Sequence, residues 1–113
     1  IDPVYTVTIP ANTTIERGEQ SVKLGSVSLD NARLEPDKNV NVSVSASGKL
    51  KNSKDESKTI AYKIMDGNKE FSTATYAESG NSTNLTLSID KSEWDKAYAG
   101  SYSDTLVFTI SYR

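Results

Sequence analysis

The feature that most constrains the fold is a regular alternation between Tyr102 and Tyr112. Its even-numbered positions carry mostly large apolar side chains, and its odd-numbered positions carry mostly Ser and Thr. A period of two is typical of a β-strand with one face in a core and the other in water. We therefore predict that this strand is central to the fold and closes it. Because it runs to the end of the chain, we also expect it to lead into a neighbouring domain of a longer protein.

Six further segments show a similar alternation and are separated by residues typical of turns. Asp66-Gly67 is a strong hairpin signal between two of them. Near Gly25 the alternation slips by one residue, which predicts a β-bulge or a bend between sheets. The six segments are residues 4–9, 21–29, 40–46, 59–65, 70–76 and 85–89.

Seven predicted strands without a long helical pattern indicate an all-β fold, an antiparallel β-sandwich formed by a single domain over residues 1–113. An up-and-down barrel is less favoured because the predicted loops differ in length. Between Asp90 and Ala97, the spacing of Asp90 to Glu93 and of Ser92 to Asp95 is a helix-start signature. We predict one or two helical turns there, which place Trp94 over an open end of the core.

Composition excludes several kinds of chemistry. The chain has no cysteine and no histidine, and its net charge is −2. Disulfides, thiolate metal sites and cysteine nucleophiles are therefore excluded, and the usual general base near neutral pH is missing. We expect no enzyme activity and no cofactor. The charge gives no field that would attract nucleic acid, and no apolar run is long enough for insertion into a membrane.

The two ends of the chain resemble a known kind of module. Trp94, the turn Ala99-Gly100 with Tyr102, and the stretch from Asp104 to Tyr112 are similar to immunoglobulin-like modules of Gram-positive bacterial surface proteins. The first strand, Tyr5 to Ala11, is similar to theirs as well. The closing strand also resembles that of the spore coat protein U and fimbrial subunit group.

The resemblance implies an immunoglobulin-like sandwich of about seven strands, with one helical turn before the last strand. It also implies a secreted or cell-surface bacterial protein in which the chain is a non-catalytic structural or adhesive module. Its partners would be neighbouring domains of the same chain, with host molecules or polysaccharides as further ligands. The isolated domain is expected to be a monomer. No catalytic residue belongs to the pattern.

A carbohydrate-binding module is the main alternative, since sugar rings stack on exposed aromatic side chains. Tyr76 and Tyr98 stand near predicted strand ends beside loops, so we expect them to form an exposed platform together with Trp94. Tyr62 and Tyr102 fall on apolar strand faces and are expected in the core.

Three other possibilities are weaker. Asp66, Asn68 and Glu70 loosely match the start of a calcium loop, but a hairpin explains the same residues without a metal. Neighbouring carboxylates such as Glu93 with Asp95 are expected on exposed turns and not in an active site. Strand exchange between subunits is less favoured, because the last strand is present and the pattern looks complete.

Overall fold

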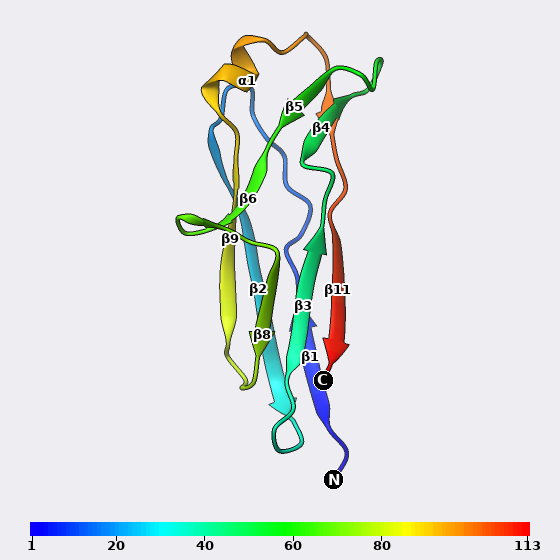
Figure 1. The fold of residues 1–113 in the computed structure, drawn as a ribbon, viewed down its shortest axis with the longest axis vertical. Helices are drawn as coiled ribbons and strands as arrows, with labels where there is room; N and C mark the ends of the chain where they lie inside the picture. The colour runs from blue at the N-terminus through cyan, green and yellow to red at the C-terminus, as the bar shows by residue number, and fades with distance from the viewer.

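The computed structural model describes all 113 residues and shows an all-β fold of antiparallel sheets with one short helix (Figure 1). It has eleven strands, more than the seven predicted, because three of the predicted strands are interrupted and β4 lies in a charged segment for which no strand was predicted. The elements are β1 (Val4–Thr8), β2 (Ser21–Arg33), β3 (Val40–Ser45), β4 (Lys49–Asn52), β5 (Thr59–Ala61), β6 (Lys63–Asp66), β7 (Lys69–Glu70), β8 (Thr73–Tyr76), β9 (Ser82–Ser88), α1 (Lys91–Asp95), β10 (Tyr102–Ser103) and β11 (Val107–Tyr112).

The strands form a five-stranded sheet and two three-stranded sheets. The first has the order β1-β2-β9-β6-β7, and the others have the orders β11-β3-β8 and β10-β4-β5. β4 continues upward from β3, and β10 leads down into β11, so the two small sheets follow one another along the molecule (Figure 1). Side chains from all three sheets meet in one core, which makes the fold β-sandwich-like.

Local chemistry explains where the strands break or bend. Gly48, with a φ of 77°, lies between β3 and β4. The predicted irregularity at Gly25 is confirmed as a register shift within β2, between Lys23 and Gly25, and β2 stays in one sheet. The predicted hairpin at Asp66-Gly67 is confirmed by the pairing of β6 with β7. The predicted helical turn is confirmed as α1.

The core is thin and the molecule is long. Only 15 of the 113 residues are buried. The principal extents are 55 × 25 × 18 Å and the radius of gyration is 16.5 Å, whereas a compact domain of this size has a radius of about 13 Å. The buried apolar side chains are Val22, Val27, Leu29, Val40, Val42, Leu50, Ile60, Tyr62, Ile64, Phe71, Tyr76, Leu85, Leu87 and Ile89.

The prediction that the last strand is central is wrong. β11 pairs only with β3 and forms the edge of its sheet, and none of its residues is buried. Val107 is 55% exposed and Ile110 is 41% exposed. Alternation reports that a strand has one apolar face, but it carries no information on how many neighbours the strand has. The pattern was therefore compatible with an edge as well as with a centre.

Candidate functional site

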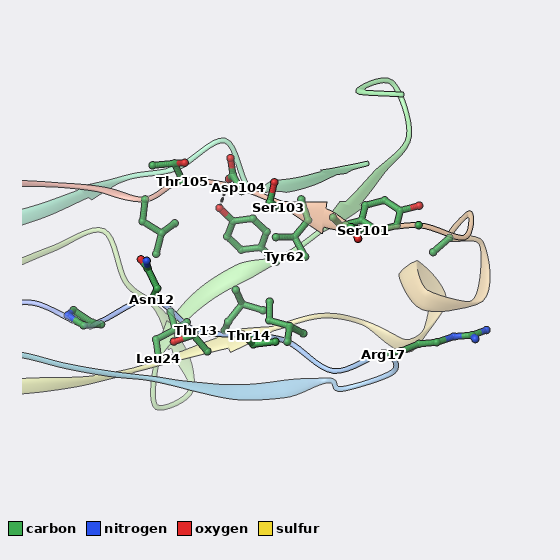
Figure 2. Close-up of a pocket in the computed structure, with 18 of the residues that line it drawn as sticks. Asn12, Thr13, Thr14, Arg17, Leu24, Tyr62, Ser101, Ser103, Asp104 and Thr105 are labelled. Carbon is green, nitrogen blue, oxygen red and sulfur yellow. Dashed lines mark hydrogen bonds between the residues drawn. The ribbon is translucent and has the colours of Figure 1, made fainter. Parts of the chain in front are cut away.

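A hollow lies along one side of the molecule, between the two layers. Its volume is about 1290 Å³, and we call it the edge groove (Figure 2). One wall is the segment 9–15 that follows β1, and the other is the segment 97–106 that leads from α1 past β10. Leu24, Leu87 and Tyr62 also line it.

The groove lies where the chain leaves the sheet after β1. Pro10 cannot donate to a β-ladder, and the residues between β1 and β2 form no regular strand. On the opposite layer, β10 continues the pairing with β4 along Tyr102 and Ser103. The irregular segment from Ala11 to Ile15 therefore faces β10 and the residues after it across an open space (Figure 2).

A polar cluster stands in the wall of the edge groove, centred on Asp104. The Asp104 carboxylate accepts hydrogen bonds from the hydroxyl of Tyr62 and from Ser47 Oγ, the latter at 2.8 Å. Lys51 Nζ lies 3.3 Å from Asp104 Oδ1. The Asp104 side chain is only 10% exposed, whereas that of Lys51 is 40% exposed. The carboxylate is therefore held by neutral donors inside the wall and by a cation at its outer face.

The cluster shifts two pKa values in opposite directions. Burial disfavours the Asp104 carboxylate, but hydrogen bonds from Tyr62, Ser47, the backbone of Thr105 and Lys51 outweigh it, so the pKa of Asp104 lies below its usual value. Burial and the adjacent Asp104 carboxylate raise the pKa of Tyr62 far above that of a free phenol. Asp104 is thus held ionised and Tyr62 is held neutral, so neither is poised to exchange a proton near neutral pH.

Other polar groups around the groove also have hydrogen-bond partners within the protein. Asn52, the only buried polar residue, donates from Nδ2 to the carbonyl of Ala99 at 3.1 Å, and its Oδ1 accepts from the backbone of Lys54 at 2.9 Å. The Tyr102 hydroxyl donates to the carbonyl of Tyr98 at 2.7 Å. No buried side-chain nitrogen or oxygen lacks a partner.

The predicted aromatic platform is not assembled. Tyr76 is only 4% exposed, and its hydroxyl lies 2.6 Å from Thr83 Oγ1 in the core, so the expectation that it is exposed is wrong. Trp94 is half-buried and donates from Nε1 to the carbonyl of Glu19 at 2.7 Å. Tyr98 is 62% exposed, and Lys58 Nζ lies over its ring at 4.7 Å from the centroid. Of the three residues, only Tyr98 presents a face to solvent.

The remaining candidate carboxylates make local structural contacts. Glu93 accepts the backbone N–H of Ala61 at 2.8 Å and pairs with Lys96 at 2.9 Å. Asp95 pairs with Lys91 at 3.0 Å on the outside of α1. Asp66 lies in the β6–β7 hairpin, opposite Lys69. No group of three or more acidic side chains is close enough to hold a metal ion.

The sequence contains a signal for the Asp104 cluster. Asp104 occupies an even position in the alternation that otherwise carries Tyr102, Leu106 and Phe108. A carboxylate on an apolar face needs partners, because burying an unpaired charge is costly. The expectation that Tyr62 lies in the core is confirmed, and its hydroxyl is one of these partners.

Comparison of the chain with protein-family models, with curated proteins and with solved structures finds no match. No helix of the structure has both the length and the apolar character needed to cross a membrane.

Proposed function

We propose that this chain is a non-catalytic structural or adhesive module of a secreted or cell-surface bacterial protein. The observation that carries the proposal is that the two groups of the edge groove with shifted pKa values, Asp104 and Tyr62, are hydrogen-bonded to each other. Asp104 is surrounded by donors, and Tyr62 is held as a neutral donor to it. A group committed to structural hydrogen bonds is a poor nucleophile or base.

We further infer an immunoglobulin-like arrangement of the strands. The order β1-β2-β9-β6 in one layer matches the neighbours A-B-E-D of that fold, and the pair β11-β3 in the other layer matches F-C. β8 lies beside β3 where strand C′ would lie, but it follows β6 in the chain, whereas C′ precedes D. This correspondence, together with the resemblance of the two ends of the chain, supports a surface module. In that fold the position beside strand F belongs to a further strand, whereas β11 has no neighbour on that side.

The positions of the termini support a module that projects from its surroundings. Ile1 and Arg113 lie at the same end of the long axis, and α1 with β4 and β5 lies at the other (Figure 1). Neighbouring domains joined at the termini would both attach at that one end. The end with α1 would then be held at the full length of the molecule, 55 Å, from the point of attachment.

A carbohydrate-binding module remains the second candidate, because Tyr98 is 62% exposed beside the edge groove. One aromatic face, partly covered by Lys58, is a smaller platform than a sugar-binding cleft normally offers. Polysaccharide binding is nevertheless the activity whose detection would most change the proposal.

The test is a pull-down of the purified protein with insoluble and immobilised polysaccharides, followed by fluorescence titration of the single tryptophan, Trp94. The structural proposal predicts no saturable binding to any member of the panel. Saturable binding that is lost in Tyr98→Ala and kept in Tyr98→Phe would overturn it in favour of a glycan-binding module. The Phe variant retains the ring, so it separates stacking from the loss of the hydroxyl.

A further inference from the structure

The outer side of β11 is an open sheet edge with a defined set of unpaired backbone groups. Arg113 and Asn39 exchange both backbone hydrogen bonds, at 2.7 and 2.8 Å, at the end of the β11–β3 ladder. Because successive residues of a strand direct their N–H and C=O to opposite sides, Thr109 and Ser111 also face β3. Phe108, Ile110 and Tyr112 therefore direct their N–H and C=O groups to the open side.

This edge lacks the features that normally keep sheet edges from pairing. Charged side chains, proline, bulges or shortness protect the edges of natural sheets. β11 pairs with β3 over six successive residues without a register shift, and Val107–Tyr112 contains no charge and no proline.

The other edge strands are protected. β1 has a register shift between Val4 and Thr6, with Pro3 before it and Pro10 shortly after it. β7 has only two residues, Lys69 and Glu70, and both are charged. β10 has two residues, β5 has three and β8 has four. β11 is thus the one long, regular and uncharged edge of the molecule.

The side chains next to this edge are apolar and incompletely covered. Val107 is 55% exposed and Ile110 is 41% exposed on β11. On β1, in the other layer, the side chain of Val4 is 55% exposed. Tyr5 of β1 stacks on Tyr112 of β11, with 5.8 Å between the ring centroids. Of the exposed large apolar residues, all except Ile1 and Tyr98 belong to β1, to β11 or to Ile9 just after β1. Val107 and Ile110 point to opposite faces of β11, so these side chains flank the open edge on both faces and do not form a single apolar patch.

We propose that the β11 edge pairs with the β11 edge of a second copy of this chain, forming an antiparallel two-fold dimer. The regular ladder runs from Val107 to Arg113, and its central residue is Ile110. A two-fold axis at Ile110 places Ile110 opposite its own copy and Phe108 opposite Tyr112 of the second copy. All three direct their backbone groups to the open edge, so this register satisfies their N–H and C=O groups.

The charges and side chains are self-complementary in this register. Thr109 faces Ser111 of the second copy, a hydroxyl pair, and Phe108 faces Tyr112, an aromatic pair, both of which stabilise sheets. The only charged residue of the run, Arg113, falls opposite Val107. The two Arg113 residues are then six positions apart along the ladder, about 20 Å, which is beyond the screening length at physiological salt.

A specific dimer at this edge needs a contribution from both layers. Stable interfaces bury about 800 Å² per partner, which is more than one strand edge provides. A two-fold axis perpendicular to the β11 sheet also brings the β1 sides together, so Val4 and Ile9 add apolar area. This dimer goes beyond the proposed function and replaces the sequence-based expectation of a monomer. Polysaccharide binding would overturn the proposed function, but it would leave the proposed dimer unaffected.

The register can be tested by cross-linking, because the chain has no cysteine. Directly opposed, hydrogen-bonded residues in antiparallel strands have Cα atoms about 5.5 Å apart, within the range of a disulfide. We expect Ile110→Cys to form a covalent dimer under mild oxidation. The matched control is Thr75→Cys, an exposed residue of β8 at the opposite edge of the same sheet, which should remain largely monomeric.

Light scattering and sedimentation of the unmodified protein provide the second measurement. Ile110→Lys places two like charges directly opposite one another and should weaken the dimer at least tenfold, whereas Thr75→Lys should leave it unchanged. The Ile110→Lys monomer should keep the thermal midpoint of the dissociated wild type, because this side chain is already 41% exposed. The proposal fails if the wild type stays monomeric at millimolar concentration. It also fails if a dimer survives Ile110→Lys, or if Ile110→Cys cross-links no faster than Thr75→Cys.

Discussion

At the scale of single residues, Asp104 is the clearest exception to the apolar alternation of the chain. Its side chain is 10% exposed and accepts hydrogen bonds from Tyr62 and Ser47, with Lys51 beside it. These residues come from the end of β10, from the link between β5 and β6, and from the β3–β4 connection with β4. The cluster therefore ties together the points at which the long strands are interrupted.

Replacing Asp104 by Asn should destabilise the fold by about 1–3 kcal/mol at pH 7, the usual cost of losing charge-assisted hydrogen bonds that are largely shielded from water. The folded pKa of Asp104 is lowered, so the carboxylate stabilises the fold above its usual pKa and this contribution is lost as the pH falls through the lowered value. Denaturant titrations of the wild type and of Asp104→Asn should therefore show a difference in the free energy of unfolding. This difference should narrow below about pH 4.

The control for this measurement is Asp95→Asn. Asp95 is exposed and pairs only with Lys91 on the surface of α1, so its replacement should change the free energy of unfolding by less than about 0.5 kcal/mol. The assigned role of the carboxylate would be contradicted if Asp104→Asn and the wild type had the same free energy of unfolding at pH 7. It would also be contradicted if their difference stayed constant down to pH 2.

Residue-level prediction from sequence succeeded where a residue lay well inside a regular pattern. Tyr62 lies within the alternation of the segment 59–65 and is buried as expected. Tyr76 ends its segment beside a polar turn, and this position indicated exposure. The structure buries it because Val40, its partner on β3, and Thr83, which meets its hydroxyl, both lie in or beside the core. A sequence carries no direct signal for such cross-strand contacts.

At the scale of elements, a buried amide helps to fix the connection from α1 to β10. Asn52 on β4 donates to the carbonyl of Ala99, and the next residue, Gly100, has a φ of 130°. A Cβ atom added at Gly100 would lie 2.8 Å from Asn52 Nδ2. The positive φ is one reason for glycine at this position, and the close contact with Asn52 is a second.

Gly100→Ala should lower the free energy of unfolding by more than Gly80→Ala does. Gly80 also has a positive φ, 91°, but nothing lies within 4 Å of an added Cβ atom there. Both variants incur the backbone strain, about 1 kcal/mol or more, and only Gly100→Ala adds about 1–3 kcal/mol from overpacking. Thermal or denaturant unfolding of the two variants measures the difference. Equal losses would show that Asn52 moves aside freely.

Most of the element pattern was predictable, whereas the pairing was not. The hairpin at Asp66-Gly67, the bulge near Gly25 and the helical turn at Trp94 each depend on neighbouring residues, and each was confirmed. The edge position of β11 depends on which strands lie beside it in space, and alternation does not encode that. The splitting of long strands likewise depends on the crossing of β5 into β6, from one sheet to another.

At the scale of the whole molecule, the structure is a long, thin sandwich that is open along one side. The β1 and β11 edges lie on this side, and the edge groove continues it toward α1 (Figures 1 and 2). The open side collects the apolar side chains that the small core leaves uncovered. The proposed dimer and the proposal that the chain is a module within an assembly both depend on this open side.

Residue-resolved amide hydrogen exchange along β11 tests this openness most directly, in a sample shown by light scattering to be monomeric. The amides of Thr109, Ser111 and Arg113 face β3 and should be protected, whereas those of Phe108, Ile110 and Tyr112 should exchange rapidly. Raising the concentration until the protein dimerises should protect the second set. Uniform protection of β11 in the monomer would contradict the account, because it would mean that another segment of the chain covers this edge.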